Sequence, residues 1–155
     1  MTNHDRIKLH QHAFDVLQGF QEIEESGSFK GFDKMLGHLV RLRASQINGC
    51  GFCVIMHTTE AREDGETNAR IDRIAVWREV ADYSPAERAA FAWTEALTRL
   101  DDPAGLEALH ADLRQFYSAP EIAQLTSIIA MINVWNRLQV AAHGGYQEAK
   151  ARDAA

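Results

Sequence analysis

Both cysteines of the chain and one histidine fall within a short segment: Cys50, Cys53 and His57. On a helix, positions i, i+3 and i+7 share one face, so the three side chains would form a single stripe. Cα atoms three positions apart on a helix are about 5 Å from each other, a separation that a disulfide tolerates. Thiols near a helix N-terminus are also favoured as thiolates. The pattern predicts a redox-active dithiol beside a proton-transfer group.

The two cysteines would have different tasks in such a redox cycle. One thiolate attacks the electrophile, and the other thiol then attacks the oxidised sulfur and closes a disulfide. Cys53 lies one helical turn before His57, which favours Cys53 as the nucleophile and Cys50 as the resolving cysteine. The helix dipole favours Cys50 instead, because Cys50 is nearer the predicted helix start. We give more weight to the proximity of Cys53 to the base His57 than to the helix dipole at Cys50. A pair of buried cysteines without a redox role is the plain structural alternative.

His38 lies on the helix that leads toward the cysteines. If the two helices fold back on each other, His38 faces the dithiol, but an ordinary exposed or core histidine fits its spacing equally well. His38, Cys50, Cys53 and His57 would also make a Cys2His2 set for zinc. Structural zinc is typical of small domains with poor cores, and its cysteines usually lie in a turn. We therefore expect neither a metal nor another cofactor.

The charged residues near these positions have simpler interpretations. Glu60 and Glu63 are expected on a solvated helix face. Glu95 lies in an apolar run, which suggests a buried carboxylate paired with Arg41 or Arg43. The sequence contains no glycine-rich phosphate loop and no serine nucleophile elbow.

Composition narrows the class of protein. The chain has 155 residues, 46% of them apolar, and a net charge of −6, which is consistent with one domain over residues 1–155. The absence of a basic cluster argues against a nucleic-acid partner. The first residues lack a hydrophobic signal core, and no apolar run approaches the ~20 residues that span a bilayer. We expect a cytoplasmic protein without a membrane partner, where a Cys-x-x-Cys pair is more often catalytic than structural.

Helical periodicity dominates the chain, so we predict an all-α fold. The expected helices cover approximately residues 5–21, 29–46, 50–64, 67–77, 85–100, 104–117 and 119–140. A turn at Asn48-Gly49 precedes the cysteine helix, Gly65 ends it, and capping boxes begin at Ser84 and Ser118. The last helix is apolar on almost every side, so we expect it at the centre of the fold and at a subunit interface.

The sequence around the cysteines resembles the AhpD-like alkylhydroperoxidase and carboxymuconolactone decarboxylase family. The likeness covers approximately residues 30–142 and is carried by Leu39–Cys53, by Met56–Thr58, and by the later segments Trp93–Thr98 and Ile132–Leu138. It implies an AhpD-like helical domain of about six to seven helices, assembled as a homo-oligomer, either a trimer or a hexamer.

The same resemblance implies a thiol peroxidase. In peroxidase members the second cysteine, here Cys53, is peroxidatic, the first, here Cys50, resolves it, and the histidine, here His57, belongs to a proton relay. The implied partners are a hydroperoxide substrate and an external dithiol, such as a lipoyl or thioredoxin-like reductant. A non-redox lyase or small-molecule-binding protein is the alternative within the family, although the intact cysteine pair favours the peroxidase.

His38 departs from the family pattern, because peroxidase members have a relay glutamate at this position. A histidine can relay protons, but it cannot supply the fixed negative charge that would orient His57 or hold it protonated. Two histidines would instead make the site more cationic at mildly acid pH and favour the thiolate. We therefore treat His38 as a candidate relay residue and expect an altered pH dependence.

Overall fold

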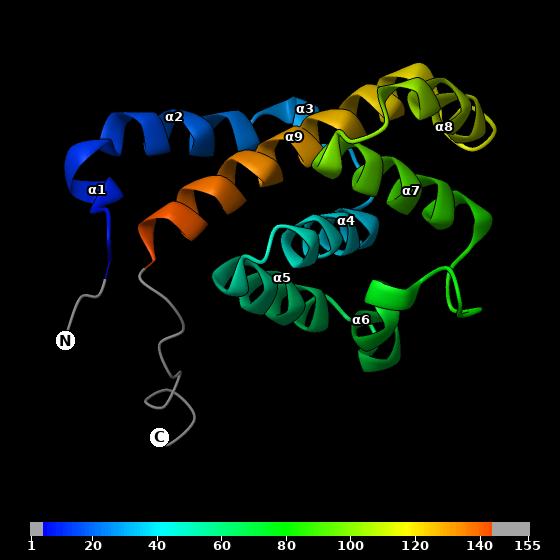
Figure 1. Ribbon diagram of the computed structural model, residues 1–155, viewed down its shortest axis with the longest axis horizontal. Helices are drawn as coiled ribbons and strands as arrows, with labels where there is room; N and C mark the ends of the chain where they lie inside the picture. Colours follow the sequence, from blue (N-terminus) through cyan, green and yellow to red (C-terminus); the bar gives the residue numbers. More distant parts are fainter. Residues whose placement is uncertain (1–4, 144–155) are drawn as a thin grey trace.

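A computed structural model of the protein describes residues 5–143, which form helices joined by short connections (Figure 1). The helices are α1 (Leu9–His12), α2 (Phe14–Glu24), α3 (Gly27–Lys30), α4 (Lys34–Ile47), α5 (Gly51–Glu63), α6 (Asn68–Arg73), α7 (Pro85–Arg99), α8 (Leu106–Leu113) and α9 (Ala119–Ala142), with 3-10 turns at Ile74–Val76 and Pro103–Gly105. Within residues 5–143 the β-structure is limited to an isolated bridge between Asp5 and His143. The prediction of an all-α fold is confirmed.

Helix α4 occupies the centre of the fold, where it contacts α5, α7 and α9 (Figure 1). Its side chains Leu39, Val40 and Leu42 are fully buried. Ala44 and Ser45 are buried as completely, and their small size lets the neighbouring helices approach closely. This arrangement places α4, whose buried face includes small residues, at the centre of the fold rather than the more apolar α9.

Helix α9 packs beside α4 and not at the centre, which corrects the first part of our expectation for it. Its first half is buried through the side chains Ile122, Leu125, Ile128, Ile129 and Ile132. Farther along, Trp135 and Leu138 are half-buried and Val140 is 46% exposed, because the helix extends past the core. None of the described helices, α9 included, combines the length and apolar character that crossing a membrane requires. A subunit interface on α9 stays a prediction.

The predicted glycine turns on either side of the cysteine helix and the two predicted capping boxes agree with the structure. Gly49 and Gly65 have φ angles of 67° and 97°, in the left-handed region that glycine adopts without a steric penalty. The capping boxes at Ser84 and Ser118 start α7 and α9. Helix α5 therefore has a defined beginning and a defined end.

Each of the first two predicted helices is interrupted. Ala13, with φ −144° and ψ 37°, separates α1 from α2. The second predicted helix is divided into α3 and α4, because the side chain of Asp33 accepts a hydrogen bond from the Leu36 amide (2.7 Å) and caps a new helix. The apolar periodicity continues across both breaks, and for that reason it did not reveal them.

Candidate active site

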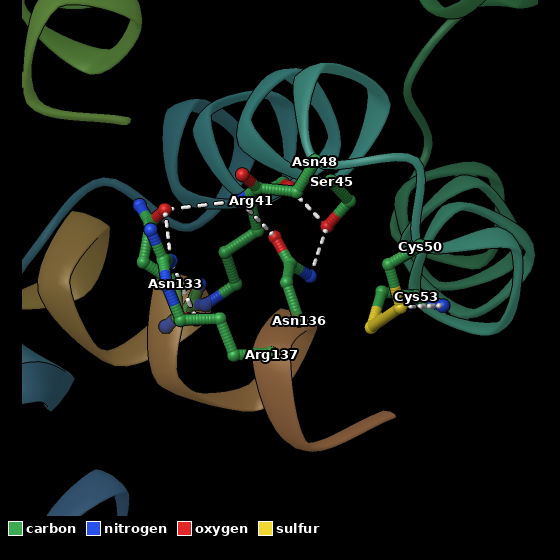
Figure 2. Close-up of a disulfide and its surroundings, with 8 residues drawn as sticks. All are labelled: Arg41, Ser45, Asn48, Cys50, Cys53, Asn133, Asn136 and Arg137. Atoms are coloured by element: carbon green, nitrogen blue, oxygen red, sulfur yellow. Dashed lines mark hydrogen bonds between the residues drawn. A yellow bond between two sulfur atoms is a disulfide. The ribbon is translucent and has the colours of Figure 1, made fainter. Parts of the chain in front are cut away.

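Cys50 and Cys53 form a disulfide at the N-terminus of α5 (Figure 2). Cys50 is the N-cap residue, and its Sγ accepts a hydrogen bond from the Cys53 backbone amide (3.4 Å). The two Cα atoms are 5.4 Å apart. Both side chains are almost completely buried. After reduction, the sulfurs would lie at the positive end of the helix dipole, which stabilises a thiolate.

A network of polar side chains holds the turn that precedes the disulfide (Figure 2). The Asn48 side-chain amide donates to the Oδ1 atoms of Asn133 and Asn136, each at 2.9 Å. Asn136, which is fully buried, donates in turn to Ser45 Oγ at 2.9 Å. Because this network joins α4 and α9 to the turn, the start of α5 has a fixed position between these helices.

His57 lies on α5, one helical turn after Cys53, and is 4% exposed. Its Nδ1 is 3.1 Å from Oε2 of Glu60, and because a carboxylate only accepts, Nδ1 carries the proton and Nε2 keeps its lone pair. That Nε2 is buried and has no hydrogen-bond partner among the described residues. Burial lowers the pKa of His57 to about 4, against the raising effect of the Glu60 carboxylate. At neutral pH the ring is therefore an uncharged base.

One expectation about the electrostatics of the site is wrong. A mildly acidic medium does not make the site more cationic through His57, because burial keeps this ring neutral to a much lower pH. The negative charge that His38 cannot supply comes from Glu60, whose Oε2 lies 3.1 Å from His57 Nδ1. We expected Glu60 on a solvated helix face, and its side chain is 42% exposed, yet its carboxylate turns toward His57. Glu63 does lie exposed, as expected.

His38 joins the same cluster because α4 and α5 pack against each other. Its Nδ1 is 3.8 Å from Glu60 Oε2, and its Nε2 is 2.6 Å from Asp64 Oδ2. Asp64 caps the C-terminus of α5 and also accepts from Lys34 Nζ at 2.6 Å. The hydrogen bonds from Lys34 and His38 lower the pKa of Asp64. The structure thus places His38, which is buried, next to Glu60 and Asp64 and not against the sulfurs, and its part in a proton relay stays a prediction.

A cavity of about 300 Å³ lies beside Cys53 and His57. Its lining is mainly apolar, through Leu17, Phe52, Met56, Ile132 and Trp135, and its charged members are Glu24 and Arg41. Burial raises the pKa of Glu24, although Arg41 and a hydrogen bond from Trp135 Nε1 (3.0 Å) oppose the shift. Burial has the opposite effect on Arg41 and lowers its pKa, because in both groups it disfavours the charged form. The cavity suits a ligand with an apolar body and a small polar group.

Sequence reasoning missed several residues of this site. The spacing of Glu60 from His57 was an available signal, because positions three apart lie on one helix face. Asp64 reaches His38 only through the packing of α4 against α5. Glu24 and Arg41 reach the cavity because α2 contacts α9 at Trp135 and α4 packs against α5 and α9. No local spacing carries that information.

The Cys2His2 zinc alternative does not apply to the disulfide form, because neither sulfur is a thiolate in it. The donor side chains that do converge in the described part of the chain are those of His38, His57 and Glu60, whose ligand atoms lie within 4.8 Å of one another.

Comparison with known proteins agrees with this architecture. Residues 15–96 match the model of the carboxymuconolactone decarboxylase family. The uncharacterized protein YdfG of Bacillus subtilis is 32% identical over 136 residues, which cover 88% of this chain and 92% of YdfG.

Solved structures show the same likeness. A protein of unknown function from Agrobacterium tumefaciens, described as a candidate antioxidant defence protein AhpD, is 34% identical, with a TM-score of 0.86 over 92% of this chain and 98% of that one. An uncharacterized peroxidase-related protein from Ralstonia eutropha, with an alkylhydroperoxidase AhpD core, is 19% identical, with a TM-score of 0.73 over 90% of this chain and 74% of that one. The second comparison concerns the fold alone.

Proposed function

Because the chain belongs to the carboxymuconolactone decarboxylase family and has an AhpD-like fold, we propose that it is a thiol-dependent peroxidase that reduces hydroperoxides through Cys50 and Cys53. One observation carries the proposal: the disulfide at the head of α5 adjoins a cavity that Cys53 shares with the buried imidazole of His57. A substrate in this cavity would meet the nucleophile and the base together.

The reaction starts from the dithiol. Nε2 of His57 accepts the proton of the Cys53 thiol, while Nδ1 keeps its hydrogen bond to Glu60, whose charge stabilises the imidazolium that forms. The Cys53 thiolate attacks the terminal oxygen of the hydroperoxide, and the O–O bond breaks. The sulfur becomes a sulfenic acid, and the departing alkoxide takes a proton from His57 to leave as an alcohol.

Cys50 then closes the cycle as the resolving residue. Its thiol attacks the sulfur of the Cys53 sulfenic acid, which releases water and forms the disulfide. An external dithiol, of the lipoyl or thioredoxin-like kind, restores both thiols by exchange and becomes a disulfide itself. His38, held by Asp64 and facing Glu60, extends the proton path away from the cavity.

The cavity and the surface indicate the kind of partners. The apolar lining favours an organic hydroperoxide over hydrogen peroxide, because an apolar body gains from leaving water. Phe14, Phe52 and Ile55 are 60%, 50% and 57% exposed on α2 and α5, and covering them supports assembly with further copies of the chain as a homo-oligomer.

The experiment compares cumene hydroperoxide consumption by the wild type, Cys53→Ser and Cys50→Ser, with dihydrolipoamide as the reductant. We expect Cys53→Ser to lose turnover. Cys50→Ser should instead retain one rapid reaction with peroxide and accumulate a sulfenic acid that dimedone traps. Unchanged turnover in Cys53→Ser would refute the mechanism.

A non-redox lyase or small-molecule-binding protein is the second candidate. Glu24 and Arg41 favour it, because a carboxyl group and a guanidinium in an apolar cavity can hold and protonate a small organic acid. The variant Cys50→Ser/Cys53→Ser separates the two functions: it would keep a lyase or binding activity and lose peroxide reduction.

A further inference from the structure

Three donor side chains converge between α4 and α5, next to the disulfide but independent of it. One ring nitrogen each of His38 and His57 and a carboxylate oxygen of Glu60 lie within 4.8 Å of one another. Glu60 Oε2 is 3.1 Å from His57 Nδ1 and 3.8 Å from His38 Nδ1. Ligands at the zinc distances of about 2.0–2.2 Å are roughly 3.3 Å apart in a tetrahedron. The two spacings lie on either side of that value.

We propose that His38, His57 and Glu60 form a binding site for a divalent transition-metal ion of the Zn²⁺ type. Two imidazoles and one carboxylate are the ligands that this class of ion prefers, whereas Mg²⁺ and Ca²⁺ require oxygen ligands. Small rotations of the three side chains would bring all donors to one centre.

The surroundings of His38 support the proposal independently of the donor count. Its Nε2 lies 2.6 Å from Asp64, so in the neutral ring Nε2 carries the proton and Nδ1 has the lone pair. That Nδ1 faces Glu60, is buried, and has no hydrogen-bond partner among the described residues. A buried acceptor without a partner is costly, and a bound cation would satisfy it. Metal-binding histidines are commonly oriented by such a carboxylate on the opposite nitrogen.

The local charges set the expected strength of binding. Arg41 acts electrostatically on both His57 and Glu60, and Lys34 is paired with Asp64, so two cations oppose the ion. The carboxylates of Glu60 and Asp64 offset them. The side chain of Glu60 is 42% exposed, which provides a path from solvent and room for a water as the fourth ligand. We expect moderate affinity and an ion that chelators remove.

Binding would also act on the peroxidase chemistry. An ion at Nδ1 of His57 displaces the proton there and replaces the hydrogen bond to Glu60, so Zn²⁺ would slow the reaction of Cys53 with peroxide. This consequence rests on the proposed function, whereas metal binding itself does not.

Metal binding is tested on the chelator-treated, disulfide-bonded protein, by Co²⁺ titration followed in visible absorption and by calorimetry with Zn²⁺. We expect one ion per chain, with Co²⁺ bands typical of nitrogen and oxygen ligands and displacement by Zn²⁺. The variant Cys50→Ser/Cys53→Ser should give the same spectrum. Failure to bind one ion per chain, or loss of the site when the cysteines are removed, would overturn the proposal.

Variants identify the ligands. His38→Ala and Glu60→Ala should each weaken Co²⁺ binding by at least ~10-fold, and Asp64→Asn by ~10–100-fold, because His38 loses its orienting carboxylate. His110→Ala, which alters a histidine on α8, is the matched control and should bind normally. Glu60→Ala keeps the test decisive if His38→Ala unfolds, because the Glu60 side chain is partly exposed. Equal weakening in Glu60→Ala and His110→Ala would overturn the assignment.

Discussion

Two clusters of ionisable side chains in the described part of the chain differ in how completely their polar atoms are paired. Glu95, whose side chain is 4% exposed, accepts hydrogen bonds from Arg43 Nε (2.7 Å), Trp77 Nε1 (2.9 Å), Arg78 Nη1 (2.7 Å) and Arg99 Nη1 (3.1 Å). The predicted pairing of Glu95 with Arg43 is confirmed, while Arg41, the other expected partner, lines the cavity. In the cluster of His38, His57 and Glu60, two buried ring nitrogens have no partner among the described residues.

This difference separates residues that support the fold from residues available for chemistry. A carboxylate with every acceptor position filled, such as that of Glu95, has no capacity for a substrate or an ion, and its removal leaves the buried Arg43 without its counter-charge. A buried imidazole with a free lone pair beside a cavity can still take a proton or bind a cation. The comparison predicts that variants of the two clusters will affect different properties.

The largest effect is expected at His57. His57→Gln removes the base, so the rate of Cys53 oxidation by limiting cumene hydroperoxide should fall by ~10²–10⁴-fold. The measurement is stopped-flow tryptophan fluorescence of the reduced protein. The loss of unfolding free energy should be smaller than in Glu95→Gln. If His57→Gln reacts like the wild type and only loses stability, the contrast between the clusters fails.

Glu95→Gln should have the opposite profile. It should lower the free energy of unfolding by ~3–5 kcal/mol, measured by urea denaturation, because the buried Arg43 loses its counter-charge. Its rate of Cys53 oxidation per folded molecule should equal that of the wild type. Arg99→Ala is the matched control, since its side chain is 41% exposed and its ion pair should contribute under ~1 kcal/mol.

The pH dependence of stability sharpens the same contrast. Burial alone would raise the pKa of Glu95, but the hydrogen bonds from Arg78, Trp77 and Arg43 outweigh it and lower the pKa from 4.5 to about 2. The folded-state pKa is below the unfolded one, so this stabilisation is complete above pH 4.5 and is lost as the pH falls toward 2. Urea denaturation between pH 2 and 7 should show a shallower acid loss in Glu95→Gln. If the free energy of unfolding falls with pH in the same way in Glu95→Gln and in the wild type, Glu95 is not the source of this acid-dependent loss of stability.

The smallest effect is expected in the network beside the disulfide. Asn136→Ala should lower the free energy of unfolding by ~1–3 kcal/mol, because Asn48 and Ser45 lose a buried partner. Ser127→Ala removes an exposed hydroxyl from the same helix and should change little. Equal losses in the two variants, measured by urea denaturation, would show that the network contributes nothing specific.

The sequence by itself determined the features that depend on neighbouring residues. The helices, the turn at Asn48-Gly49 and the capping boxes follow from local hydrogen bonding and backbone conformation. The spacing of Cys50, Cys53 and His57 along one helix was readable for the same reason. The assignment of chemical roles to these residues stays a proposal, because their local pattern identifies reactive groups and not their reaction.

Only the tertiary structure decided how those groups are surrounded. Folding of α4 onto α5 placed His38 against Glu60 and Asp64, and the packing of α2 and α9 enclosed the cavity beside Cys53. The same packing buried His57 and kept its ring neutral, against the expectation from its sequence neighbourhood. The pKa of a side chain depends on desolvation and on charges within a few ångströms. Those neighbours come from different helices, so their distances exist only after the chain has folded.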